Sequence, residues 1–137
     1  MSLITVGTAL QGCGSSPTSP SGAAPALATI LGSVVSNTVT LTVDTASPLA
    51  SNGSAALVQS TAGNFLVSRT GADAFTALTA VCTHEQCTVT GFDSPRYVCP
   101  CHGSQYSTSG AVVQGPATRA LTQFTTRFAN NVLTITL

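Results

Sequence analysis

Both histidines and four of the five cysteines of this 137-residue chain lie in one stretch, residues 82–106. It reads Cys82-Thr83-His84-Glu85-Gln86-Cys87 and, after a short connection, Cys99-Pro100-Cys101-His102-Gly103-Ser104-Gln105-Tyr106. Each half offers one thiolate and one imidazole to a shared centre: Cys82 with His84, and Cys99 with His102. Thiolate sulfur and imidazole nitrogen are ligands of zinc and of iron centres. The pattern therefore predicts a metal centre with two Cys and two His ligands.

Other interpretations of these residues explain less. A structural zinc site usually has two cysteines followed by two histidines, whereas here the order alternates. Two structural disulfides in an exported domain would leave both histidines without a role. A nucleophilic Cys-His pair needs only one cysteine and an orienting partner, so it ignores most of the pattern.

Cys-x-His followed by Cys-Pro-Cys-His-Gly-Ser-x-Tyr resembles the high-potential Rieske iron-sulfur proteins of cytochrome bc and bf complexes, over residues 82–117. In a Rieske 2Fe-2S cluster two histidines replace two cysteines on one iron, which raises the reduction potential. The resemblance implies that Cys82, His84, Cys99 and His102 ligate such a cluster. It also implies a Cys87–Cys101 disulfide that clamps the two ligand loops together.

The resemblance assigns roles to the neighbouring residues as well. Ser104 would donate a hydrogen bond to a bridging sulfide and Tyr106 to a ligand cysteine, and such donors raise the potential. Gly103 would let the backbone pass close to the cluster or adopt a positive φ. Pro116, within Gly115-Pro116-Ala117, would lie in a loop that covers the cluster and limits the access of water.

The chain departs from the family beside the first histidine. The family usually has an apolar residue and then glycine there, and this chain has Glu85-Gln86. A carboxylate at this position would disfavour an apolar quinol pocket, so the redox partner stays open. We expect an electron-transfer protein or oxidoreductase subunit without turnover of its own.

Three electron-transfer functions and one structural function fit these residues. The first is the head, or a soluble relative, of the iron-sulfur subunit of a quinol:cytochrome c oxidoreductase, with cytochrome c and quinol as partners. The second is the small Rieske subunit of a periplasmic molybdenum enzyme such as arsenite oxidase, with the molybdenum subunit as partner. The third is an oxygenase ferredoxin, against which Cys87, Cys101, Ser104 and Tyr106 weigh. A zinc-binding structural module is the fourth.

Composition limits the class of protein further. The chain has four arginines, no lysine and four acids, so only 6% of its residues are charged and the formal net charge is zero. No basic patch exists for nucleic acid, and no apolar run reaches the eighteen or so residues of a membrane-spanning helix. A disulfide persists best in an oxidising compartment, which favours a periplasmic or exported protein.

The first 26 residues are rich in Gly, Ser, Pro and Thr, which predicts a flexible lead-in before a Rieske domain over 27–137. Within it, Leu10-Gln11-Gly12-Cys13 resembles the end of a bacterial lipoprotein signal, in which the cysteine is lipidated. The basic and apolar regions of a complete signal peptide are missing. We therefore interpret the segment as an export-signal remnant with a lipid anchor at Cys13, or as an arm with an incidental thiol.

From residue 27 onward, short apolar or alternating runs separated by turn residues predict an all-β fold of antiparallel, sandwich-type sheets. Asn130-Asn131 predicts a two-residue hairpin turn, because asparagine tolerates positive φ. Residues 80–118 are expected to form a small cluster-binding subdomain that carries the two ligand loops. The family resemblance implies three stacked sheets with these loops at one tip. The predicted strands are 27–31, 38–43, 55–59, 64–68, 74–80, 96–98, 123–129 and 132–137, with breaks at 47–48, 52–53 and 70–71.

Overall fold

The computed structural model describes residues 24–83 and 86–137, and every regular element in these ranges is a β-strand. The lead-in cysteine Cys13, together with His84 and Glu85, lies outside the described residues. The strands are β1 Ala28–Leu31, β2 Ser33–Val35, β3 Thr38–Thr42, β4 Ala55–Ser60, β5 Gly63–Gly71, β6 Ala74–Thr79, β7 Gly91–Asp93, β8 Arg96–Val98, β9 Gln105–Ser107, β10 Val112–Gln114, β11 Gln123–Ala129 and β12 Val132–Thr136.

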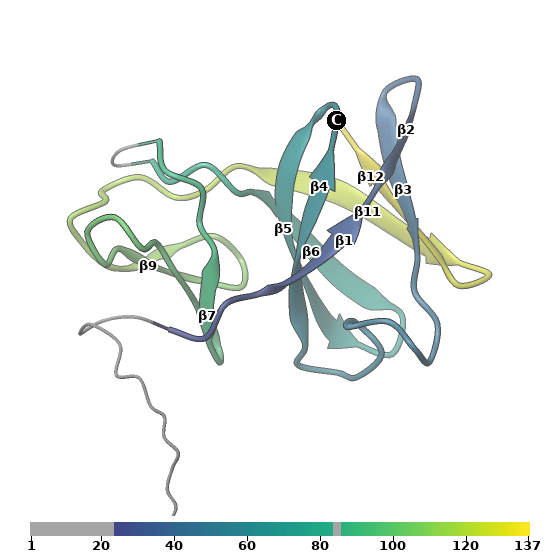
Figure 1. Ribbon diagram of the computed structural model, residues 1–137, viewed down its shortest axis with the longest axis horizontal. Helices are drawn as coiled ribbons and strands as arrows, with labels where there is room; N and C mark the ends of the chain where they lie inside the picture. Colours follow the sequence, from purple (N-terminus) through teal and green to yellow (C-terminus); the bar gives the residue numbers. More distant parts are fainter. Residues whose placement is uncertain (1–23, 84–85) are drawn as a thin grey trace, which may run out of the picture.

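Eight strands form one continuous hydrogen-bonded ladder in the order β1-β4-β5-β6-β11-β12-β3-β2. The ladder bends into two layers at β11, which pairs with β6 through Gln123 and Phe124 and then with β12 from Thr125 onward (Figure 1). All pairs in it are antiparallel except β1 with β4, which is parallel. The predicted all-β antiparallel fold is therefore confirmed, with one parallel pair at an edge.

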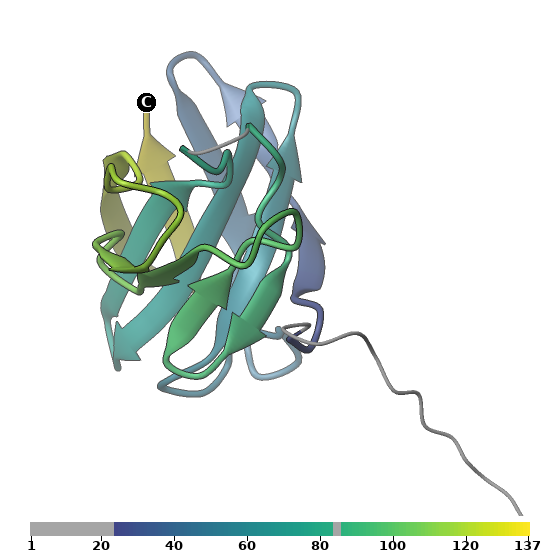
Figure 2. The same ribbon diagram turned by 90° about the vertical axis from the view of Figure 1, so that its left-hand side faces the viewer.

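The remaining four strands form a smaller antiparallel sheet in the order β10-β9-β8-β7. It lies at one end of the molecule, where Figure 2 views it face-on in front of the larger layers. Loops before β7, between β8 and β9, and between β10 and β11 extend from this sheet. The two Cys/His segments belong to the first two of these loops.

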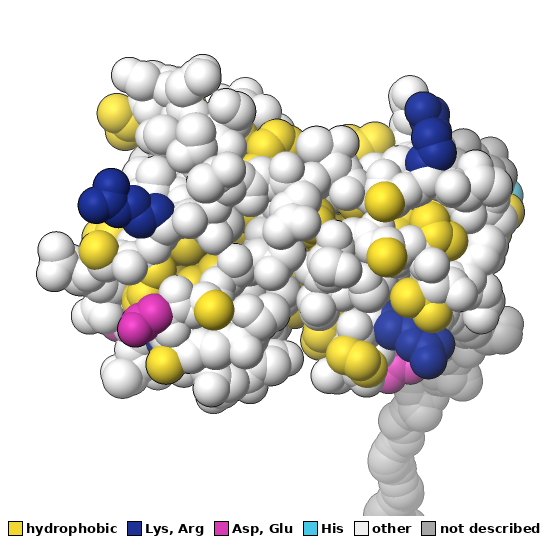
Figure 3. Space-filling model, turned by 180° about the vertical axis from the view of Figure 1, so that it is seen from behind, with side chains coloured by type: hydrophobic (Ala, Val, Ile, Leu, Met, Phe, Trp, Pro, Cys, Tyr) yellow, Lys and Arg dark blue, Asp and Glu magenta, His cyan; other side chains and the backbone are white. Residues whose placement is uncertain are grey.

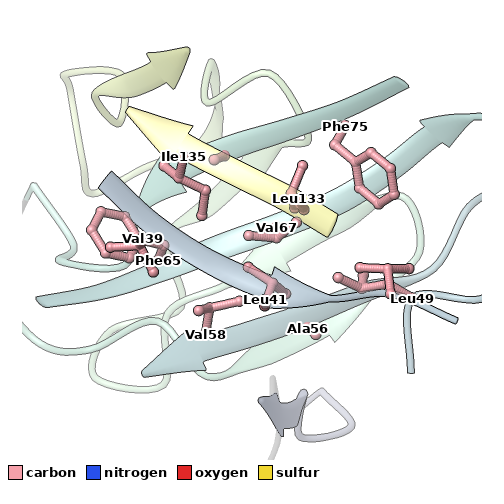
Figure 4. Close-up of a cluster of buried hydrophobic side chains, with 12 residues drawn as sticks. Val39, Leu41, Leu49, Ala56, Val58, Phe65, Val67, Phe75, Leu133 and Ile135 are labelled. Atoms are coloured by element: carbon pink, nitrogen blue, oxygen red, sulfur yellow. The ribbon is translucent and has the colours of Figure 1, made fainter. Parts of the chain in front are cut away.

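The middle layer, β4-β5-β6, is buried on both faces. Alternate residues of each strand point to opposite faces, so in β4 Val58 joins one core while Leu57 joins another. The first core lies between this layer and β3 and β12, as Figure 4 shows for residues such as Val39, Phe65 and Ile135. The second core lies between the middle layer and the small sheet and includes both ligand-segment cysteines, Cys82 and Cys99. The predicted stack of three is therefore present as three layers, two of which are parts of the eight-stranded ladder.

Short-range sequence signals explain most strands. In β3 and β12 the Thr-x-Thr alternation places threonines outside and Val39, Leu41 and Leu133 inside. Asn130 and Asn131 have φ of 53° and 62°, which confirms the hairpin turn.

One predicted break, at residues 70–71, was wrong. Strand β5 continues to Gly71, and its pairing with β6 shifts register between Arg69 and Gly71. The four strands that the sequence did not predict, β2, β7, β9 and β10, have three residues each.

The surface is poor in charge. Figure 3 shows a few arginine and acidic side chains separated by wide uncharged areas, with hydrophobic side chains between them. Arg69 is held by the protein, because its guanidinium donates to the carbonyls of Leu49, Ala50 and Ala72 and lies over the rings of Phe75 and Phe128. No helix in the described residues is long and apolar enough to cross a membrane.

Candidate metal centre

The two Cys/His segments fold into loops that are closed by the same backbone pattern. In each loop the amide of the first cysteine donates to the carbonyl five residues later, and the amide four residues later donates back to the cysteine carbonyl. The four bonds are Cys82 N to Cys87 O at 2.7 Å, Gln86 N to Cys82 O at 2.9 Å, Cys99 N to Ser104 O at 2.8 Å and Gly103 N to Cys99 O at 3.0 Å. The loops are therefore structural repeats that present Cys82 and Cys99 in equivalent places.

Both of these cysteines carry thiols and are about 1% exposed. Burial raises the pKa of Cys99, and the neighbouring Cys82 thiol adds to the rise, so the two sulfurs are close enough to influence one another. A charged thiolate in such a site needs compensation by a metal or by hydrogen-bond donors. His102, by contrast, is exposed on the second loop.

A disulfide joins Cys87 of the first loop to Cys101 of the second, with Cα atoms 6.5 Å apart. This confirms the predicted pairing. The bond links loops that are otherwise separated by β7 and β8. It fixes the first cysteine of each loop relative to the other.

The Tyr106 hydroxyl lies at the centre of a small hydrogen-bond network. It accepts a hydrogen bond from the Thr83 amide at 3.2 Å and lies 3.1 Å from both the Cys82 sulfur and the Thr83 hydroxyl. Thr83 donates its own hydroxyl hydrogen to the Arg119 carbonyl at 2.7 Å. The Tyr106 hydrogen is therefore directed to the sulfur of Cys82 or to Thr83 Oγ1. The pKa of Tyr106 is raised, mainly by burial, and the hydroxyl therefore stays protonated and can donate.

A third loop, residues 115–121, is attached to both ligand loops. The amide of Ala117 donates to the Ser104 hydroxyl oxygen at 3.0 Å, and the Arg119 carbonyl accepts the bond from Thr83. Ala117 and Leu121 are each 3% exposed and pack in the core that contains the cysteines. Pro116 is exposed, so Ala117 and Leu121, rather than the proline, lie against that core.

The structure places the other predicted site residues as follows. Gly103 has a φ of +80°, and a Cβ there would meet no atom within 4 Å, so glycine is favoured by the backbone conformation rather than by space. Ser104 is 1% exposed, and because its oxygen accepts from Ala117 its hydroxyl hydrogen is available to another acceptor. His84 lies outside the described residues.

The sequence did not single out Thr83 or Arg119 as parts of the site. Thr83 could have been suspected, because it lies between two predicted ligands. Arg119 is 36 residues from Thr83 in the chain. Nothing in the local pattern indicates their contact, because it depends on how the third loop packs.

The donor set fits an iron-sulfur cluster. Two buried thiols lie in equivalent loops beside a directed hydroxyl, and an exposed imidazole is offered by the second loop. Soft thiolate ligands suit iron-sulfur clusters, and hydrogen bonds to sulfur are a means by which proteins tune them. Cys82, Cys99, His102 and, from the sequence, His84 are the residues that would hold the cluster.

Comparisons with known proteins agree with this chemistry. The family described as the Rieske 2Fe-2S domain matches residues 40–125. The cytochrome b6-f complex iron-sulfur subunit of Prochlorococcus marinus (strain MIT 9301) is 43% identical over 74 residues, which are 50% of this chain and 41% of that subunit. The chain thus spans less than half the length of this curated relative.

Solved structures show the same fold. The plasma membrane Rieske protein of Synechocystis PCC 6803 is 27% identical and superimposes with a TM-score of 0.55 over 61% of this chain and 86% of that one. The ferredoxin of carbazole 1,9a-dioxygenase from Nocardioides aromaticivorans IC177 has a TM-score of 0.56 over 71% of this chain and 96% of that one, but it is only 18% identical and shows the fold alone. The chain therefore belongs to the Rieske 2Fe-2S domain family: its cofactor is a Rieske 2Fe-2S cluster and its function is electron transfer.

Proposed function

We propose that this protein is an exported, high-potential one-electron carrier whose cluster is ligated by Cys82, His84, Cys99 and His102. The high-potential assignment rests on the position of the Tyr106 hydroxyl, which lies 3.1 Å from the Cys82 sulfur. When bound, a Rieske 2Fe-2S cluster supplies one-electron redox chemistry at a potential between about −150 and +300 mV. A hydroxyl donor aimed at a ligand sulfur stabilises negative charge there and raises the potential.

The protein's own residues would prepare the site in three ways. Tyr106 and Ser104 would donate hydrogen bonds to sulfur. The Tyr106 hydroxyl already lies beside the Cys82 sulfur, and the Ser104 oxygen accepts from Ala117, which leaves its hydrogen available. The Cys87–Cys101 bond would hold the ligand loops at a fixed separation. The third loop would exclude water from the sulfurs, because Ala117 packs in the same core as the cysteines. Pro116 and Gly103 would shape the loop backbones beside the cluster.

The ligand assignment can be tested by substitution. We expect Cys82→Ser, Cys99→Ser, His84→Ala and His102→Ala each to abolish binding of iron and acid-labile sulfide in anaerobically purified protein. Cys13→Ser is the matched control, because it removes the fifth cysteine and should leave the cluster intact. Zinc in place of iron, or a full cluster in any of the four ligand variants, would contradict the assignment.

For the physiological system we propose the head, or a soluble relative, of a quinol:cytochrome c oxidoreductase iron-sulfur subunit. Support comes from the 43% identity to a cytochrome b6-f complex subunit and from the disulfide and tyrosine donor. A second candidate is the small Rieske subunit of a periplasmic molybdenum enzyme such as arsenite oxidase. Glu85-Gln86 favours it, because polar residues beside the ligand histidine suit a quinol pocket poorly.

The proposed location is periplasmic or exported, since the Cys87–Cys101 bond persists best in an oxidising compartment. A lipid at Cys13 would then attach the protein to a membrane. Mass spectrometry of the N-terminal peptide from the membrane fraction of the native host would detect it. An unlipidated Cys13 would rule out the anchor without affecting the electron-transfer function.

Two measurements separate the carrier types. Protein-film voltammetry of the holoprotein should give a midpoint potential in the upper part of the Rieske range of about −150 to +300 mV. A value near the lower limit would contradict the high-potential assignment and indicate a ferredoxin that supplies an oxygenase. Reduction by a water-soluble quinol would then distinguish the quinol-oxidising system from the molybdenum enzyme system.

A further inference from the structure

Arg119 is the one arginine on the ligand-loop side of the described structure whose guanidinium has no protein partner. Arg69 is bound by carbonyls and aromatic rings, and Arg96 donates to the Gln105 side chain at 2.9 Å. Arg127 lies on β11, in the larger ladder. Arg119 is exposed, and within the described residues it forms a hydrogen bond through its backbone carbonyl and none through its guanidinium.

The backbone at Arg119 is nevertheless held firmly. Its carbonyl accepts from Thr83 of the first ligand loop, and two residues earlier Ala117 donates to Ser104 of the second. Two residues later, the buried Leu121 donates its amide to the Gly110 carbonyl at 2.9 Å. The loop therefore presents one exposed cation at a fixed place beside both ligand loops, so only the side chain itself would lose freedom on binding.

The two ligand loops and the third loop together form the tip of the molecule. In the part of the chain that the structure describes, this tip carries no charge besides Arg119, apart from the ionisable imidazole of His102. Its exposed residues in the second and third loops include Pro100, Cys101, Pro116 and Ala120. Two described charges of the small sheet, Asp93 and Arg96, face each other across the β7–β8 turn, at the strand ends away from the ligand loops. Arg119 therefore carries the fixed charge among the described residues of this tip, and Glu85 of the first ligand loop lies outside those residues.

We propose that Arg119 is a docking determinant for a c-type cytochrome that presents a carboxylate beside its haem. An uncharged quinol would gain little from an exposed guanidinium, whereas an acidic protein surface is attracted to it and oriented by it. The proposal rests on the proposed function, because it takes the tip to be the site of electron exit. One electron passes from the reduced protein to the ferric haem of the partner, which becomes ferrous.

The test is stopped-flow oxidation of the reduced holoprotein by two c-type cytochromes of similar potential, one acidic and one basic at the exposed haem edge. With the acidic cytochrome at low ionic strength, Arg119→Gln should lower the second-order rate constant about two- to fivefold and weaken its salt dependence. Arg119→Lys should retain most of the rate. With the basic cytochrome, Arg119→Gln should raise the rate constant or leave it unchanged.

Arg127→Gln is the matched control, because it removes the same charge from an exposed position near the β11–β12 hairpin, at the opposite end of the molecule (Figure 1). An equal loss of rate in Arg119→Gln and Arg127→Gln would overturn the proposal, since only net charge would then matter. An equal response to the acidic and basic cytochromes would also overturn it. Failure of the proposed function would appear separately, as a missing or low-potential cluster in spectra and voltammetry of the unmodified protein.

Discussion

Gln86 and Gly103 occupy equivalent positions in the two ligand loops, and both have a left-handed backbone conformation. Each lies four residues after the first cysteine of its loop and donates its amide to that cysteine's carbonyl. Their φ angles are 57° and 80°. Glycine adopts such angles without strain, whereas a residue with a side chain is disfavoured. The second ligand loop thus has the expected glycine, whereas the first has glutamine in a backbone conformation that is strained for a residue with a side chain.

Exchanging these residue types should shift stability in opposite directions. Gly103→Ala should lower the free energy of unfolding by about 1–2 kcal/mol although its Cβ would meet no atom within 4 Å, because only the backbone conformation opposes it. Gln86→Gly should be neutral or raise the free energy by up to about 1 kcal/mol. Thermal unfolding of the holoprotein followed by visible circular dichroism would measure both. A large destabilisation by Gln86→Gly would show that the glutamine side chain has a structural role.

The sequence predicted the parts of the fold that depend on local pattern. Thr38–Thr42 and Val132–Thr136 alternate regularly, and Asn130-Asn131 supplies two residues that tolerate positive φ. The four strands that were missed, β2, β7, β9 and β10, have three residues each, although each pairs with a strand that is near it in the chain, as β2 does with β3. A window of three residues carries too little periodicity to identify a strand.

The sequence predicted the part of the candidate site that depends on the types and spacing of its Cys and His residues. The Cys87–Cys101 bond followed from the family resemblance. The link from Thr83 to Arg119 could not be predicted, because it requires the path of the third loop. Glu85-Gln86 appeared in the sequence only as a polar substitution, and the backbone strain at Gln86 became visible in the structure.

Tyr106→Phe should lower the midpoint potential while the cluster stays bound. The change removes the hydroxyl that lies 3.1 Å from the Cys82 sulfur, and it also leaves the Thr83 amide without its acceptor. Protein-film voltammetry at a fixed pH would measure the effect. An unchanged potential would reject the donor role of Tyr106.

Tyr97 provides a matched control for this experiment. It lies directly opposite Tyr106 in the β8–β9 pairing and is equally buried, but its hydroxyl has no regular hydrogen bond. Burial raises the pKa of Tyr97, an effect that the neighbouring Ser68 hydroxyl only partly offsets, so the group stays neutral. Tyr97→Phe should therefore leave the potential unchanged, with stability unchanged or slightly increased.

Ser104→Ala should lower both the potential and the stability. It removes a hydroxyl donor beside the cluster and leaves the amide of the buried Ala117 without an acceptor, which costs about 1–3 kcal/mol. Voltammetry and thermal unfolding of the same sample would report the two effects. Ser68→Ala is the control, because Ser68 is the other buried serine within residues 24–83 and 86–137 and its hydroxyl has no regular hydrogen bond. A similar fall in potential in both variants would exclude a specific role for Ser104.

Thr83→Val should speed the loss of the cluster, because it detaches the third loop from the first ligand loop. Valine keeps the shape of threonine but cannot donate to the Arg119 carbonyl, and one such bond contributes about 0.5–1.5 kcal/mol. If this bond opposes opening of the loop, release of iron to a chelator should accelerate by up to about tenfold. Thr126→Val removes a comparable hydroxyl-to-carbonyl bond, to Phe75 at 2.9 Å, from a half-buried position in the larger ladder. It should reduce overall stability by a similar amount without changing the release rate. Equal acceleration in the two variants would mean that global unfolding, rather than opening of the third loop, controls access to the metal site.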